Sequence, residues 1–316
     1  MGVAMENCCI KGRILESSGG LYTVLTEQGT TIKCKPRGRF RNDNLKVLVG
    51  DYVTVLFDKG ENPCIEAVLE RSNCLIRPSL SNLDVLFCVV AAARPAPAIL
   101  TLDKLISIAD HIGIEPIVVI SKSDLVSEEA DKLERIYRDC GFTVFSCSAV
   151  NDDGVGAILD YIKLNCMDRT IAFSGASGVG KSTLINHLFP GTSLETGTVA
   201  EKTGRGRHTT RSVSLLPLSI LLKDETACGY LADTPGFSML DFAGFDFYRL
   251  EDLPYAFREF RPYIGQCRYQ KCTHLKEEGC AILGAVNCGK IPRTRHDSYL
   301  DLYATLKSKP SWEKKM

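Results

Sequence analysis

The sequence has no long apolar run, no excess of either charge and no export leader. Its most apolar stretch, Val85–Ala93, ends at Arg94-Pro95, and this length suits a buried strand and is too short to span a bilayer. Met1–Ile10 has no basic segment followed by an apolar one. The 38 basic and 38 acidic side chains balance, so any attraction to nucleic acid must come from local basic patches. These absences predict a soluble protein without a membrane partner.

Cysteine is abundant, but its distribution does not indicate disulfides. The 14 cysteines are scattered through predicted strands and helices of a 316-residue chain, whereas disulfide frameworks are typical of short secreted domains. We therefore predict a reducing, cytoplasmic location. The length allows two or three domains, each with its own core.

The most specific motif is a phosphate-binding loop. Gly175-Ala176-Ser177-Gly178-Val179-Gly180-Lys181-Ser182 fits G-x-x-x-x-G-K-[S/T] at every fixed position, between a strand-like run at 170–174 and a helix-like run at 182–188. Backbone amides in such a loop turn inward around phosphate oxygens, and the helix N-terminus adds its positive dipole end. We expect Lys181 to neutralise charge on the β- and γ-phosphates, Ser182 to hold Mg²⁺, and Thr183 to lie in the same site.

Strand and helix patterns alternate before this loop, which predicts a mostly parallel, doubly wound α/β sheet. Ligands of such sheets bind beyond the carboxyl ends of the strands. The predicted elements are the strands Asp84–Ala93, Pro116–Ser121 and Phe142–Ser146 and the helices Leu102–Ile112, Ser127–Cys140 and Val155–Leu164.

Two short motifs fall at those strand ends. Ser121-Lys122-Ser123-Asp124 resembles the guanine motif N-K-x-D, in which the Asp124 carboxylate would accept from N1–H and the N2 amino group of guanine and so select GTP over ATP. Ser121 stands where Asn is usual. The change removes an amide able to bond the base and brace the phosphate loop, so we expect weaker affinity with the base preference retained. Ser148-Ala149 resembles the S-A motif that contacts guanine O6.

Two further segments resemble the switches of a GTPase. Asp233-Thr234-Pro235-Gly236 resembles D-x-x-G, whose aspartate supports Mg²⁺ through water and whose Gly236 amide would sense the γ-phosphate. In the glycine- and arginine-rich stretch before it, Thr210, favoured over Thr209, is expected to complete the Mg²⁺ shell.

The residue after the D-x-x-G motif bears on catalysis. Phe237 occupies the place where many GTPases carry a glutamine that orients the attacking water, and a phenyl ring cannot form that hydrogen bond. We hypothesise that His208 orients the water instead, with Lys181 and Thr210 as the other catalytic groups.

The order of the motifs indicates a circular permutation. Ordinary GTPases place the phosphate loop first and the guanine motifs last, whereas here the guanine motifs come first. A doubly wound domain can be opened elsewhere and rejoined through nearby termini without losing the convergence of its motifs.

A metal-binding pattern follows the GTPase motifs. Cys267-x₄-Cys272-x-His274-x₅-Cys280 offers three thiolates and an imidazole, a common structural zinc set, and we expect the ion to replace a missing core in this region. Cys288 is more distant and is left out. A helix is predicted near Ser298–Lys307. Basic residues expected to be exposed for phosphate contact are Arg261, Arg268, Lys271, Lys276, Lys290, Arg293 and Arg295.

The N-terminal region shows closely spaced strand patterns without an intervening helix, such as Leu21–Thr26, Thr30–Cys34 and Tyr52–Phe57, which favours an OB-type barrel. A basic segment within it suits RNA contact, with a solvated basic loop as the alternative. The segment contains Lys33, Lys35, Arg37, Arg39, Phe40 and Arg41.

Together the barrel, the permuted GTPase motifs and the Cys₃His spacing resemble the bacterial ribosome small subunit-dependent GTPase A family (RsgA, also called YjeQ), over essentially the whole chain. The resemblance implies a GTPase that binds the immature small ribosomal subunit late in assembly, is stimulated by it and leaves after hydrolysis. It also implies rRNA contact through the barrel and the zinc module.

We accordingly expect a barrel over residues 1–70, a permuted GTPase over 71–245 and a mostly helical zinc-binding domain over 246–316. The expected cofactors are GTP or GDP, Mg²⁺ and one structural Zn²⁺. The partners would be the small subunit and its rRNA, with no DNA, and the protein would be monomeric. Two alternatives remain: an RNA-binding scaffold with a passive nucleotide switch, which measurable hydrolysis would exclude, and an ATP-driven enzyme, which nucleotide competition would exclude.

Overall fold

The structure, a computed structural model, describes residues 8–38, 40, 45–57, 62–75, 78–190, 213–233 and 249–308. The chain forms two compact units. One contains Met1–Asp84, Cys166–Ala172 and Glu201–Phe237, and the other contains Val85–Asn165, Phe173–Ala200 and Ser238–Met316. Within the described residues, every helix falls short of the length and apolarity that crossing a membrane requires.

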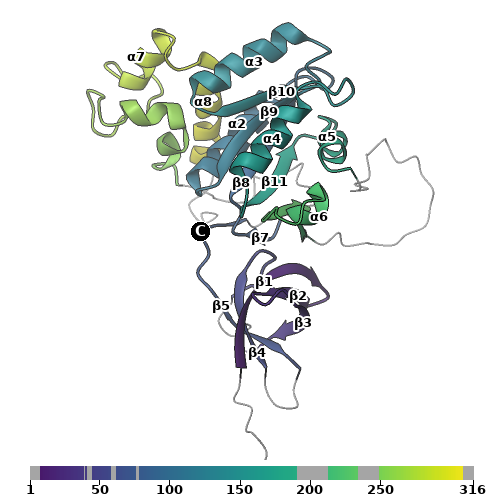
Figure 1. Ribbon diagram of the computed structural model, residues 1–316. Coiled ribbons are helices and arrows are strands. Elements are labelled where there is room, and N and C mark those ends of the chain that lie inside the picture. Colours follow the sequence, from purple (N-terminus) through teal and green to yellow (C-terminus); the bar gives the residue numbers. More distant parts are fainter. Residues whose placement is uncertain are drawn as a thin grey trace, which may run out of the picture. The chain divides into compact units, whose positions relative to one another are not determined.

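The first unit contains a closed five-stranded barrel (Figure 1). Its strands pair in the order β1-β2-β3-β5-β4, and β4 pairs back onto β1, with β3–β5 as the parallel pair. Alternate side chains such as Ile14, Val24 and Val55 are fully buried inside it. The strands are β1 (Cys8–Ser18), β2 (Leu21–Thr26), β3 (Thr31–Pro36), β4 (Tyr52–Phe57) and β5 (Cys64–Val68). The predicted OB-type barrel is confirmed.

Further strands continue the sheet beside the barrel. The short β6 (Cys74–Leu75) and β7 (Leu80–Ser81) pair with each other. Strand β12 (Ser214–Pro217) pairs with β1 at Glu16↔Ser214 and lies antiparallel to β13 (Tyr230–Asp233), and α6 (Leu218–Leu222) connects β12 to β13. In turn β13 pairs in parallel with the start of β11 (Thr170–Gly175).

The second unit contains the predicted alternation of strands and helices. Strands β8, β9 and β10 are parallel, and the sheet order is β10-β9-β8-β11. All seven residues of β8 are buried, as a central strand of a parallel sheet requires. The elements are β8 (Val85–Ala91), α2 (Ile99–His111), β9 (Glu115–Ser121), α3 (Ser127–Asp139), β10 (Thr143–Cys147), α4 (Val155–Asn165) and α5 (Lys181–Leu188).

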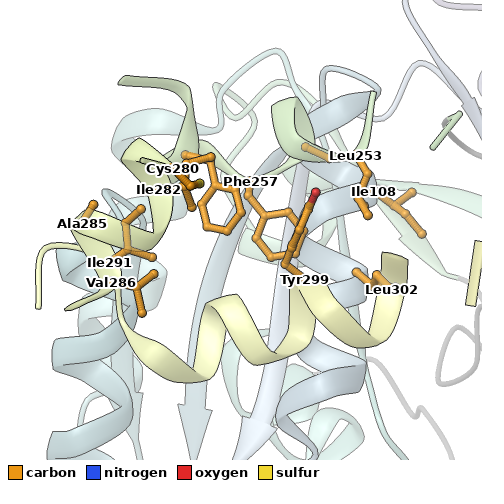
Figure 2. Close-up of a cluster of buried hydrophobic side chains, with 12 residues drawn as sticks. Ile108, Leu253, Phe257, Cys280, Ile282, Ala285, Val286, Ile291, Tyr299 and Leu302 are labelled. Carbon is orange, nitrogen blue, oxygen red and sulfur yellow. The ribbon is translucent and has the colours of Figure 1, made fainter. Parts of the chain in front are cut away.

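The C-terminal part of the second unit has its own hydrophobic core, shown in Figure 2. Phe257, Phe260 and Tyr299 form its centre, with ring centroids 5.1–5.5 Å apart. Ile108 of α2 joins them, so this region packs on α2. The elements are η1 (Leu253–Ala256), η2 (Arg258–Tyr263), α7 (Ala281–Asn287) and α8 (Arg293–Ser308). The expectation that a metal replaces a missing core is therefore wrong, because the core exists.

One predicted basic contact is also wrong. Arg295 is fully buried, where its guanidinium donates to Asp103 Oδ1 at 2.6 Å and to Glu259 Oε1 at 2.6 Å. Tyr137 donates to the same Asp103 oxygen. Helix α8 begins at Arg293, before its predicted start, and this helical phase turns Arg295 inward.

Candidate nucleotide site and metal centre

The phosphate loop leaves β11 through a glycine that nothing else could replace. Gly175 has a φ of +152°, and a Cβ there would lie 2.1 Å from the Val89 carbonyl oxygen. Gly178 and Gly180 also have positive φ, and Gly180 is the N-cap of α5. The turn therefore depends on backbone conformations that favour glycine and brings the loop directly onto a helix N-terminus.

Lys181, the first residue of α5, lies over its own loop. Its Nζ donates to the carbonyl oxygens of Gly175 at 2.7 Å and Ala176 at 2.8 Å. Burial lowers the pKa of Lys181 to about 8. An ammonium held in place by backbone carbonyls and partly stripped of water is suited to binding a phosphate anion.

The guanine-motif segment braces the phosphate loop. The buried Ser121 hydroxyl donates either to Val179 O at 2.5 Å or to Val90 O at 3.2 Å. Lys122 Nζ donates to Gly178 O at 2.8 Å. Two successive loop carbonyls thus point toward the end of β9, so Ser121 supplies a hydroxyl brace where the usual asparagine amide is missing.

The residues predicted to read the base lie at the ends of β9 and β10. Asp124 is exposed, and its carboxylate has no hydrogen-bond or ion-pair partner within the described part of the chain. Ser123 N donates to Cys147 O at 3.2 Å, which joins this segment to the end of β10. Ser148, next in the chain, is buried, and its backbone exchanges hydrogen bonds with Asp153. Ala149 follows it, half-buried. The structure therefore links the N-K-x-D-like and S-A segments.

The remaining predicted nucleotide residues are only partly described. Ser182 and Thr183 lie in the first turn of α5, and Asp233 is the last residue of β13. His208, Thr210 and Gly236 fall outside the described residues. The predicted roles of these three residues stay predictions.

The four predicted zinc ligands converge in the C-terminal part. One ligand atom from each of Cys267, Cys272, His274 and Cys280 lies within 4.8 Å of all the others. His274 Nδ1 is 3.4 Å from Cys280 Sγ and 3.6 Å from Cys267 Sγ, and the two sulfurs are 3.8 Å apart. In a tetrahedral zinc site, bonds of about 2.3 Å to sulfur and 2.0–2.1 Å to nitrogen separate ligand atoms by roughly 3.8 Å (S to S) and 3.5 Å (S to N). The cluster fits zinc.

Amide hydrogen bonds to the cysteine sulfurs and the burial of His274 also favour zinc binding. Ala281 N donates to Cys267 Sγ at 3.3 Å, and Leu283 N in the first turn of α7 donates to Cys280 Sγ at 3.5 Å. Donors of this kind stabilise thiolate, the form that binds metal. Burial lowers the pKa of His274, which favours the neutral imidazole that can act as a ligand.

Residues outside the ligand set hold the loop that carries His274. Glu277 accepts hydrogen bonds from the Thr273 hydroxyl and from the amides of Thr273, Leu275 and Lys276. Burial alone would raise the pKa of Glu277, but these donors lower it to about 2. On the other side of the loop, α8 contributes His296 Nε2, 2.8 Å from His274 O, and Tyr299 Oη, which donates to Thr273 O.

The sequence reasoning missed these supporting residues. A carboxylate three residues after a predicted histidine ligand is only a weak signal that Glu277 accepts hydrogen bonds from the amides of the ligand loop. For His296 and Tyr299, the i, i+3 spacing could be recognised only once α8 was known to start before them. Cys288 is exposed and lies outside the cluster, as predicted.

Comparison with known proteins agrees with this geometry. The family described as RsgA GTPase matches residues 68–243, and the one described as RsgA N-terminal domain matches residues 11–65. A protein named small ribosomal subunit biogenesis GTPase RsgA from Caldanaerobacter subterraneus subsp. tengcongensis is 41% identical, covering 95% of this chain and 97% of that one. The protein of the same name from Bacillus subtilis is 34% identical, with 95% and 98% covered.

Two solved structures match nearly the whole chain. The crystal structure of YjeQ from Thermotoga maritima is 30% identical with a TM-score of 0.77, covering 96% of this chain and 100% of its own. YloQ, described as a circularly permuted GTPase, is 29% identical with a TM-score of 0.75, and the shares covered are 98% and 99%. The predicted permutation and fold class are confirmed. With its braced phosphate loop, guanine-motif segment and closed barrel, this chain belongs to the RsgA family of circularly permuted GTPases, and it is a GTP hydrolase.

Proposed function

We propose that this protein acts in late maturation of the small ribosomal subunit, binding the subunit and hydrolysing GTP to GDP and phosphate with stimulation by it. The observation that carries the nucleotide part is the contact of Ser121 and Lys122 with Val179 O and Gly178 O. It brings a guanine-selective segment against a phosphate loop, which is the arrangement a GTPase needs. The name shared by the relatives from C. subterraneus and B. subtilis supports the subunit as the setting.

In this proposal each nucleotide-binding residue has a specific role. Asp124 selects guanine, and Ser148 and Ala149 contact its O6. The loop from Gly175 to Ser182, followed by Thr183, surrounds the phosphates, and Lys181 neutralises their charge. Gly236 senses the γ-phosphate, and His208 orients the attacking water.

The RsgA family implies a guanine nucleotide and Mg²⁺. Ser182, Thr210 and Asp233 would hold Mg²⁺, because hydroxyl and carboxylate oxygens are its preferred ligands, and the ion would supply charge neutralisation at the β- and γ-phosphates. Cys267, Cys272, His274 and Cys280 would hold one Zn²⁺ with a structural role.

RNA contact would come from two surfaces. On β3, Lys33 and Lys35 are exposed on either side of the buried Cys34, so both lysines face outward from the barrel. Beside the metal cluster, Arg268, Tyr269 and Lys271 are exposed, and the Arg268 guanidinium lies 5.7 Å from the Tyr269 ring centroid. Outward cations and an exposed aromatic ring suit phosphate contact and base stacking.

We also retain the three-part division at residues 70 and 245, a monomeric state and a cytoplasmic location as parts of the proposal. The two family matches, which meet between residues 65 and 68, support the first boundary.

The deciding experiment measures steady-state GTP and ATP hydrolysis by the purified protein with and without small ribosomal subunits. Stimulation of GTP turnover alone is expected. Tight subunit binding without stimulation of GTP turnover would favour the RNA-binding scaffold with a passive nucleotide site. Equal use of ATP would remove the role given to Asp124.

A further inference from the structure

A buried arginine connects the barrel to the strands that lead to the proposed nucleotide-binding residues. Arg13 of β1 is 6% exposed, and its guanidinium carbon lies 4.8 Å from the centroid of the Tyr52 ring and 4.9 Å from that of Tyr230. Its Nη2 donates to Thr170 Oγ1 at 2.5 Å and to Asn82 O at 3.2 Å. A permanently charged fork is thus held between two ring faces by neutral acceptors.

The groups around Arg13 come from strands with different tasks. Tyr52 lies in barrel strand β4, directly across from Arg13. Thr170 is the first residue of β11 and Tyr230 the first of β13, and these two are register partners. Strand β11 ends at Gly175 of the phosphate loop, and β13 ends at Asp233. Arg13 therefore contacts the starts of both strands whose other ends carry nucleotide residues.

Backbone hydrogen bonds also contribute to holding the starts of these two strands. Thr170 is fully buried, its amide donates to Asp84 Oδ2 at 2.7 Å, and its carbonyl accepts from Asp84 N at 2.9 Å. Tyr230 N donates to Arg169 O at 2.9 Å. The Thr170 hydroxyl and the Tyr230 ring, which stand on paired strands, thus have Arg13 as a common partner.

We propose that Arg13 of barrel strand β1 is a positioning residue for GTP hydrolysis, which holds β11 and β13 in the register that hydrolysis requires. The inference rests on the proposed GTPase function. A strand is stiff along its length, so a shift of Tyr230 against β11 is carried along β13 to Asp233. Binding of GDP needs the phosphate loop and the guanine segment, whereas hydrolysis also needs Asp233 in place.

The test uses the full-length protein with two substitutions and a control. Arg13→Met removes the charge and the fork, and Thr170→Val keeps the branched shape of the side chain while removing the acceptor. The control is Arg135→Met, because Arg135 is exposed on α3 and the one side-chain hydrogen bond that it makes among the described residues, 3.5 Å long, goes to Asp131 O within the same helix. Thermal unfolding identifies folded variants, and Thr170→Val serves if Arg13→Met does not fold.

Two readouts separate positioning from general destabilisation. For Arg13→Met we expect kcat for GTP to fall about tenfold while the Kd for GDP stays within about twofold, a split that loss of stability alone does not produce. Hydrogen exchange is expected to rise about tenfold in peptides covering 170–171 and 230–231 and not in β9. Thr170→Val should show the same pattern with smaller changes, and Arg135→Met none.

The outcomes are distinct. An unchanged kcat, a parallel loss of GDP binding, or faster exchange throughout the protein would each overturn the proposal. A wild-type protein that does not hydrolyse GTP would overturn the proposed function instead and the role in hydrolysis with it. In that case exchange at β11 and β13 would still show whether Arg13 fixes the two strands.

Discussion

The metal cluster and the nucleotide site differ in how far the protein prepares them. The four proposed metal ligands lie in one short stretch, Cys267–Cys280, and backbone amides, Glu277, His296 and Tyr299 form hydrogen bonds within and to that stretch. The proposed nucleotide-binding residues come from segments far apart in the chain. Lys181 donates to carbonyls of its own loop, and Asp124 is exposed. Ligand atoms already at tetrahedral spacing suit an ion that stays bound. Groups that must exchange their present partners for a ligand suit a nucleotide that comes and goes.

The largest effect should come from a substitution in the metal cluster, whose ligand atoms are already close together. Cys280→Ser is expected to abolish zinc retention and to lower the free energy of unfolding by about 4 kcal/mol or more, at the upper end for single substitutions. Because the core around Phe257 and Tyr299 remains, far-UV circular dichroism should retain most of the helical signal. Metal content is measured by atomic absorption. The matched control, Cys288→Ser, removes an exposed thiol outside the cluster, and a similar loss of zinc there would refute the ligand set.

The next largest effect concerns the selection of guanine at the nucleotide site. Asp124→Asn replaces an acceptor pair with an amide that can donate, so the affinity for GDP should fall by about 2 kcal/mol, roughly 30-fold, and xanthosine diphosphate should bind better than GDP. Competition against a fluorescent nucleotide measures both constants. Unchanged preference for guanine would move base recognition away from this residue.

The pH dependence of GDP binding should distinguish Lys181, which can lose its proton, from an arginine, which stays charged. Its pKa in the nucleotide-free protein is about 8, and phosphate binds the charged form. The Kd for GDP should therefore be constant from pH 7 toward 8 and rise about tenfold for each further pH unit, since binding must then take up a proton. Lys181→Arg stays charged and should bind with a flat profile up to pH 9. A flat wild-type profile would contradict the lowered pKa.

The smallest effect should come from the brace between the two halves of the nucleotide site. Ser121→Ala removes the hydroxyl that reaches Val179 O and should weaken GDP and GTP alike by about 1 kcal/mol, roughly fivefold. The preference for guanine over adenine should not change, in contrast to Asp124→Asn. Ser121→Thr keeps the hydroxyl and should stay within about twofold of wild type. A change in base preference for Ser121→Ala would show that the serine reads the base rather than supporting the loop.

Local patterns were sufficient to predict the parts of the fold that local chemistry determines. The phosphate loop, its strand and its helix follow from glycines with positive φ, and the ends of β9 and α3 agree with the predicted ranges to within a residue. Strand β12 was not predicted, because four residues ending in Pro217 carry too little periodicity to identify.

Contacts between distant residues account for the rest. The Ser121 hydrogen bond joins residues 58 positions apart. The guanine motif indicates a brace at this position, but not that a serine hydroxyl supplies it. Arg295 stands among exposed basic residues in the sequence, yet it is buried because Asp103 and Glu259 lie opposite it on other elements. A charged side chain's burial depends on such partners, which periodicity does not reveal.

The seam between the barrel and β12 has a consequence for the order of folding. The barrel strands pair within the first 68 residues, whereas the pairing of Glu16 with Ser214 joins residues 198 positions apart. During synthesis the barrel can close as soon as β5 has emerged, but Arg13 cannot meet Tyr230 until most of the protein has been made. The barrel is thus expected to fold first. The last strands of its unit, β12 and β13, then add to it through Glu16 and Arg13 of β1.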